Sequence, residues 1–141
     1  MLVWQAPVAG PDSKSLWAPE LHLIDGKWYI YYAADDGLNE NHRMWVLEGV
    51  TPNPCGPFRS RGALETSGWA IDGTVVNLNE LGLFFVWSGW PGKENGRQNL
   101  YIAPMVNPWT LAGERVLIAM RQVVREQRAI TSLFGRSAVQ P

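Results

Sequence analysis

The amino-acid sequence predicts an all-β fold built from two similar four-stranded units. Three observations support this prediction. Short apolar or alternating runs follow one another between Trp17 and Met120, turn residues separate these runs, and an internal repeat recurs with a period of roughly fifty residues. Helix signals are nearly absent from this part of the chain, so a mixed α/β fold is not expected.

The first unit begins with a hairpin. Asp25-Gly26 is a two-residue turn of the kind that requires positive φ, and it separates an apolar run from the returning run KWYIYYA. A loop rich in Asp, Gly and Asn leads to the third strand, and a segment rich in Pro and Gly leads to the fourth. The expected strands cover residues 20–24, 27–33, 43–47 and 58–64.

The second unit repeats this order. Its first hairpin is longer, because residues 77–82 stand where the first unit has two turn residues. The expected strands cover residues 71–78, 83–88, 100–105 and 115–119. Since each unit has four strands, the repeat is typical of consecutive blades of a β-propeller. An eight-stranded sandwich is the alternative, but it gives no reason for a recurring signature.

That signature is Trp-Ala-x-carboxylate. It occurs as WAPE at residues 17–20 and as WAID at residues 69–72, with an offset of 52. In a blade the first strand is innermost, so we expect Glu20 and Asp72 to lie near the mouth of the central channel. Converging carboxylates suit acid and base chemistry on sugars. The alternative is structural, with each carboxylate accepting backbone hydrogen bonds that tie one blade to the next.

The composition narrows the classes of partner and cofactor. Twelve basic and 13 acidic side chains give a formal charge of −1, which favours neither a nucleic-acid nor a membrane partner. Cys55 is the single cysteine, so no internal disulfide can form, and no Cys/His spacing resembles a zinc site. The N-terminal residues contain no signal-peptide pattern, and no run is long and apolar enough for a membrane helix. We therefore expect a soluble chain with no cofactor.

Several segments resemble a known enzyme family. The stretches WAPELHLIDGKWYIYYAADDG, NENHRMWVLEG, WAIDGTVV, FFVWSGWPG, QNLYIAPM and NPWTL are similar to the five-bladed propeller glycosidases of glycoside hydrolase family 43. The resemblance covers about residues 3–119 and is strongest to arabinofuranosidase-type members. It implies an inverting hydrolase that acts on arabinose- or xylose-containing polysaccharides of the plant cell wall, and a parent enzyme that is secreted.

The resemblance also assigns candidate site residues. The family uses an Asp general base in the first blade, a Glu general acid in the fourth, and an Asp in the third that raises the pKa of the acid. Asp72 matches the third-blade motif and inherits this modulating role. Glu20 matches a second-blade motif that lines the substrate pocket. The other candidates for substrate contact are Trp17, His22, Trp69 and Trp90, for each of which a purely structural role is the alternative.

Two elements of the family pattern are missing. The first-blade Asp-Pro motif should lie upstream of the WAPE segment, and no Glu-Gly-Pro segment occurs anywhere in the sequence. The chain is therefore expected to hold the end of blade 1 and blades 2 and 3 within residues 1–120, and to be inactive alone. Family members often hold calcium on a His of a later blade, so no metal is expected here. A non-catalytic carbohydrate-binding or interaction module is the alternative function.

The sequence changes character after Met120. Residues 121–141 carry four Arg and one Glu, whereas residues 1–120 carry eight basic and 12 acidic side chains. Apolar residues at helical spacing within this tail permit a short amphipathic helix or disorder. The shift favours a divergent basic tail that arose from a frameshift or splice misreading, and an evolved cap is the alternative. Two blades without neighbours leave apolar faces bare, so an oligomeric or aggregation-prone chain is expected.

Overall fold

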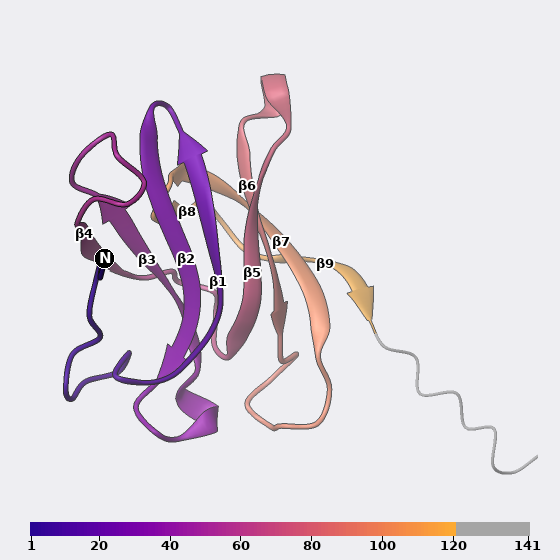
Figure 1. The fold of residues 1–141 in the computed structure, drawn as a ribbon. Helices are drawn as coiled ribbons and strands as arrows, with labels where there is room; N and C mark the ends of the chain where they lie inside the picture. Colours follow the sequence, from indigo (N-terminus) through magenta and orange to yellow (C-terminus); the bar gives the residue numbers. More distant parts are fainter. Residues whose placement is uncertain (121–141) are drawn as a thin grey trace, which may run out of the picture.

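Residues 1–120, which the computed structural model describes, form two antiparallel β-sheets that pack against each other (Figure 1). The first sheet has four consecutive strands in sequence order: β1 (Lys14–Ile24), β2 (Lys27–Asp35), β3 (Arg43–Gly49) and β4 (Phe58–Ala63). The second has β5 (Ala70–Asn77), β6 (Leu83–Gly89), β7 (Asn99–Asn107) and β8 (Thr110–Leu111), and β9 (Val116–Met120) also pairs with β7. The prediction of an all-β fold with two similar units is confirmed.

The length and backbone conformation of each hairpin loop agree with the residues that the sequence places there. Ile24 lies opposite Lys27, and the two residues between them, Asp25 and Gly26, both have positive φ, at 48° and 76°. This geometry matches the right-handed twist of the strands and favours Asp-Gly. The longer hairpin between β5 and β6 contains a short 3-10 turn, η2 (Asn79–Leu81). A second 3-10 turn, η1 (Asn39–Asn41), joins β2 to β3.

Strand β1 is longer than predicted. It begins at Lys14 rather than at residue 20, and it contains two bulges, one between Lys14 and Trp17 and one between Trp17 and Glu20. Ser15 and Ala18, one in each bulge, have positive φ values of 48° and 41°. A bulged, largely exposed strand has no regular alternation of apolar and polar residues, and this explains why the sequence pattern missed its first half.

The last strand of the second unit is split. The sequence predicts a single strand over residues 115–119, but β8 pairs with β7 near Met105 and β9 pairs with β7 nearer its beginning. Gly113, with φ of 71°, lies between the two pieces. A residue in this conformation interrupts an extended strand, so the fourth strand is divided in two.

The main core lies between the two sheets. Tyr31 and Met44 of the first sheet and Phe85 and Trp87 of the second are fully buried in one apolar cluster. The Tyr31 hydroxyl donates a hydrogen bond of 2.6 Å to the carbonyl of Pro108, which ties the sheets together. Sheets that pack face to face in this way have the arrangement of neighbouring propeller blades.

A second apolar cluster covers the outer face of the first sheet. It is built on Tyr32, Trp45, Leu47 and Phe58, and the N-terminal segment packs against it through Val3 and Trp4. Strands β2 and β3 therefore bury side chains on both faces, and this accounts for their nearly continuous apolar sequences.

No helix within residues 1–120 has the length and apolarity needed to cross a membrane. The predicted basic tail, residues 121–141, lies outside the described residues.

Candidate functional site

The candidate residues gather at one end of the two sheets. Strands β1 and β5 contact each other, and both begin at the lower end in Figure 1, where η1 and the loop between β6 and β7 also lie. Trp17 belongs to the early part of β1, and Trp69 immediately precedes β5. The fold therefore brings together two segments that are 52 residues apart in the sequence.

Glu20 and His22 form a pair on β1. Their side chains lie on the same side of the strand because the positions differ by two. The Nε2 atom of His22 is 3.0 Å from Oε2 of Glu20, and the side chains are 23% and 47% exposed, respectively. The His22 and Tyr31 rings are also nearly perpendicular, with centroids 5.5 Å apart. The Glu20 carboxylate is held in place but remains accessible to a ligand.

Asp72 lies in a β-bulge. The register between β5 and β6 shifts between Ile71 and Thr74, so Asp72 and Gly73 together oppose a single residue. Asp72 has positive φ, at 51°, and is exposed. A bulge changes the direction of a side chain relative to a regular strand. The carboxylate is therefore directed by the backbone and faces solvent.

The strand register shows that Glu20 and Asp72, which match in the sequence repeat, do not occupy equivalent positions in their strands. Ser15 and Ser67, each two residues before the repeated Trp, both have positive φ, so the local backbone does repeat at an offset of 52. Asp72 lies within its bulge, as Ala18 does in β1, whereas Glu20 follows its bulge. The two carboxylates of the repeated signature therefore occupy different positions relative to the bulge.

The aromatic candidates form a continuous series. Trp17, which is 43% exposed, stacks on His42 with ring centroids 4.0 Å apart. The His42 ring lies 6.4 Å from Trp69, and Trp69 stacks on Trp90 at 4.7 Å with an interplanar angle of 10°. Trp69 also donates a hydrogen bond of 2.8 Å to the carbonyl of Asn39 in η1. Because Trp69 and Trp90 are buried, Trp17 offers the largest accessible ring face of the three.

His42 is the residue at this end that sequence reasoning missed. It is fully buried between Trp17 and Trp69, and its Nδ1 lies 2.7 Å from Oδ2 of Asp35. Its carbonyl accepts the N–H of Ala70, the first residue of β5. Burial lowers the pKa of His42, and the Asp35 carboxylate opposes this effect. The chain has only two His, and a His that follows a polar loop gives no pattern that would mark it in advance.

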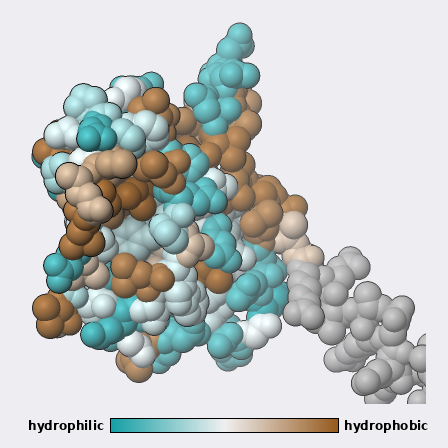
Figure 2. Space-filling model, in the orientation of Figure 1, coloured by the Kyte–Doolittle hydropathy of each residue, from teal (hydrophilic) through white to brown (hydrophobic). Residues whose placement is uncertain are grey.

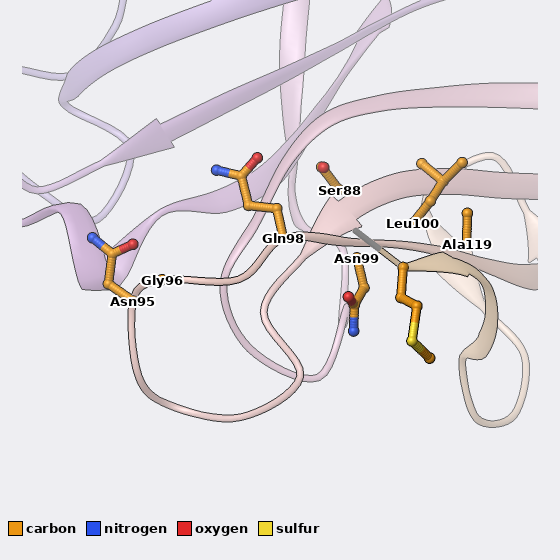
Figure 3. Close-up of a pocket in the computed structure, with 8 residues that line it drawn as sticks. Ser88, Asn95, Gly96, Gln98, Asn99, Leu100 and Ala119 are labelled. Carbon is orange, nitrogen blue, oxygen red and sulfur yellow. The ribbon is translucent and has the colours of Figure 1, made fainter. Parts of the chain in front are cut away.

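A cavity of about 500 Å³ opens beside β6, β7 and β9 (Figure 3). Ser88, Gln98 and Asn99 line it with polar side chains. Asn99 donates through Nδ2 to the Tyr101 hydroxyl at 3.2 Å, while its Oδ1 has no partner within residues 1–120. None of the residues predicted from the sequence lines this cavity, so it is separate from the candidate site.

No group of three or more His, Cys, Asp or Glu side chains within residues 1–120 could hold a metal ion.

Known proteins resemble this chain over most of its length. Residues 1–131 match the family described as Glycosyl hydrolases family 43. Alpha-L-arabinofuranosidase 43 of Humicola insolens is 37% identical over 123 residues, which are 84% of this chain and 25% of that protein. The extracellular exo-α-(1→5)-L-arabinofuranosidase of Streptomyces avermitilis is 36% identical over 115 residues, which are 79% of this chain and 24% of that protein.

A solved structure shows the same relation. The α-L-arabinofuranosidase from Lactobacillus brevis is 36% identical and superposes with a TM-score of 0.73, covering 83% of this chain and 40% of that chain. The two sheets are thus part of a β-propeller, as predicted. The chain spans about a quarter of the length of the two sequence relatives. It belongs to the glycosyl hydrolases of family 43.

Proposed function

We propose that this chain forms part of the catalytic propeller of an α-L-arabinofuranosidase. The observation that carries the proposal is that the relatives from Humicola insolens and Streptomyces avermitilis, and the solved structure from Lactobacillus brevis, are all named for this activity. The substrate class is the arabinose-containing arabinan or arabinoxylan of plant cell walls, and β-xylosyl linkages are the second choice. Since the Streptomyces relative is named extracellular, we propose that the parent enzyme is secreted.

Asp72 is proposed to raise the pKa of a general acid. An inverting glycosidase places an acid and a base roughly 6.5 to 9.5 Å apart, with room between them for the attacking water. A nearby negative charge disfavours ionisation of the acid and keeps it protonated near neutral pH. The exposed carboxylate at the β5 bulge suits this electrostatic role. Asp72 itself transfers no proton in this scheme, and the acid and base come from other blades.

Glu20, His22 and Trp17 are proposed to contact substrate. The Glu20–His22 pair offers both hydrogen-bond acceptors and a donor, and the half-exposed Trp17 ring offers an apolar face for a sugar. Trp69 and Trp90 are 5% and 3% exposed, so their proposed contribution is to shape the pocket through their ring edges.

The purified chain is expected to release no nitrophenol from aryl α-L-arabinofuranoside or β-xyloside beyond the rate in buffer. The physical reason is that Asp72 modulates an acid that the chain is proposed to lack. Turnover close to that of complete family 43 enzymes would contradict this expectation. In that case the acid would be sought among Glu20, Glu94 and Glu126, each replaced by Gln.

A non-catalytic carbohydrate-binding module is the second candidate function, favoured by the exposure of Trp17 beside the Glu20–His22 pair. It predicts that arabino-oligosaccharides bind without being hydrolysed. Trp17→Ala should weaken this binding about tenfold, because stacking on one indole contributes on the order of a kilocalorie per mole or more. Leu23→Ala, at an exposed position near the other end of β1, is the control and should change nothing.

A further inference from the structure

A second cavity opens beside the Trp69–Trp90 stack, and its charge is unlike that of the chain as a whole. Its volume is about 530 Å³, within the range of pockets that hold small ligands. The wall on one side comes from η1 and the start of β3, and the other wall comes from the residues after β6 and from Arg115. The cavity therefore lies between the two sheets, at the end where the candidate site residues gather.

Basic side chains dominate its lining. Arg43, Lys93 and Arg115 line the cavity, and Glu40 is the one carboxylate among the lining residues of the described chain. Residues 1–120 carry more acidic than basic side chains, so this excess of positive charge is local. Such a pocket attracts anions, and the attraction is stronger where the walls exclude water.

The buried polar atoms of this lining that have no partner within residues 1–120 are donors. They are Nη1 of Arg115 and Nε1 of Trp90. The Arg115 guanidinium is fixed in place, because its Nη2 donates to the Trp90 carbonyl at 3.0 Å and its Cζ lies 4.0 Å above the Tyr101 ring. A fixed guanidinium with an uncommitted N–H is suited to a carboxylate oxygen, since buried donors without acceptors are costly.

We propose that this cavity binds a uronic-acid residue of a polysaccharide. The carboxylate would be bound by Arg115 and Lys93, and the sugar ring would lie beside the edges of Trp69 and Trp90. The enzyme would then favour chains in which an acidic sugar lies near the arabinose that is removed. The inference rests on the proposed function for its polysaccharide, whereas the preference for an anion follows from the cavity alone.

The test is titration of the purified full chain with sodium glucuronate, glucose and inorganic phosphate at constant ionic strength. Glucuronate should bind at least about tenfold more tightly than glucose, because a charge-assisted hydrogen bond is lost with the neutral sugar. It should also bind more tightly than phosphate, which lacks the ring. Equal binding of glucose, equal binding of phosphate, or no binding of glucuronate would each overturn the proposal.

Variants locate the site. Arg115→Lys should weaken glucuronate binding about tenfold, because the charge remains but the planar guanidinium, fixed by the Trp90 carbonyl and the Tyr101 ring, is lost. Lys93 is exposed, so its removal should leave the fold intact, and Lys93→Ala keeps the proposal testable if the Arg115 variant does not fold. Glu40→Gln should strengthen binding, because it removes the opposing charge. Arg97→Gln, at an exposed position outside the lining, is the matched control.

A parallel titration with arabino-oligosaccharides separates this inference from the proposed function. If the arabino-oligosaccharides bind and glucuronate does not, only the acidic-sugar inference fails. If glucuronate binds and is sensitive to Lys93→Ala and Glu40→Gln while the arabino-oligosaccharides do not bind, the cavity assignment holds and the arabinose assignment fails. Glucuronate binding that neither variant changes would place the ligand elsewhere and overturn the inference.

Discussion

Asp72 and Gly73 share one β-bulge, and the direction of the Asp72 side chain depends on the packing of Gly73. The bulge directs the Asp72 carboxylate, and Gly73 lets the backbone approach the core at that point. A Cβ at position 73 would overlap the Phe85 ring and lie 3.0 Å from Cε of Met44. The direction of the proposed modulator is therefore set by close packing of its neighbour between the sheets.

Gly73→Ala should destabilise the chain by about 1–3 kcal/mol, because Phe85 and Met44 must move to accept one methyl group. The free energy of unfolding in urea measures this loss. Gly92→Ala is the matched control, since a Cβ there meets no atom within 4 Å and the backbone is not in the left-handed region. A Gly73 variant as stable as this control would show that the bulge is not held by packing.

His42 should make stability depend on pH. Its pKa in the folded chain is lowered by burial, with Asp35 opposing and Arg43 adding to the decrease. The unfolded chain therefore binds the proton more readily, and stability should fall as the pH drops below the ordinary value of 6.5. Urea unfolding of the wild type and of His42→Gln between about pH 7.5 and about pH 5.5 measures the effect. An unchanged slope in the variant would contradict the assignment.

At the scale of elements, β3 connects its neighbours through one buried carboxylate. Glu48 is 1% exposed, and it pairs with Lys27 of β2 and with Arg59 and Arg61 of β4. Burial alone would raise the pKa of Glu48, but the three cations outweigh it and hold the pKa below its ordinary value. The Cζ atom of Arg61 also lies 4.1 Å from the centre of the Trp109 ring, in the turn between β7 and β8, so the cluster reaches the second unit.

Glu48→Gln should lower the free energy of unfolding by about 1–3 kcal/mol near neutral pH, because a buried acceptor of three charged hydrogen bonds loses its charge. Because the pKa of Glu48 is lower in the folded chain than in the unfolded chain, the ionised carboxylate stabilises the fold fully above the unfolded value of 4.5. This stabilisation is lost as the pH falls through the pKa of the folded chain. The difference between wild type and variant should therefore shrink near about pH 3. Lys27→Ala, which removes a side chain that is 58% exposed, should cost less than about 1 kcal/mol.

At the scale of the whole molecule, apolar side chains remain on the surface next to the end of the described chain (Figure 2). All five residues of β9 are exposed, and Val116, Leu117, Ile118 and Met120 are among the exposed large apolar residues. A sheet face of this kind is normally covered by the next blade of a propeller.

The purified chain should therefore associate with itself in a concentration-dependent manner, which sedimentation velocity measures. The double variant Val116→Lys/Ile118→Lys should shift the distribution toward monomer. Leu81→Lys is the control, because Leu81 is exposed in the β5–β6 hairpin, away from β9. A monomeric wild type, or a double variant that associates as strongly, would contradict this expectation.

The sequence predicted most of the fold because its signals are local. The Asp25-Gly26 turn and the apolar runs of β2 and β6 depend on neighbours within a few residues. The first half of β1 and the split between β8 and β9 were missed, since bulges and interruptions follow from pairing with another strand. For the candidate site, the repeated signature pointed to Trp17 and Trp69, whereas no sequence pattern pointed to His42, which the fold places between them.

The sequence by itself determined the fold class, the positions of most strands and the family resemblance that family comparison bears out. Only the tertiary structure decided how the carboxylates of the two similar Trp-Ala segments are placed. Glu20 follows a bulge and pairs with His22, whereas Asp72 lies inside a bulge that Gly73 and Phe85 fix by close packing. Register and packing join residues distant in the chain, so a short motif cannot specify the direction of its own carboxylate.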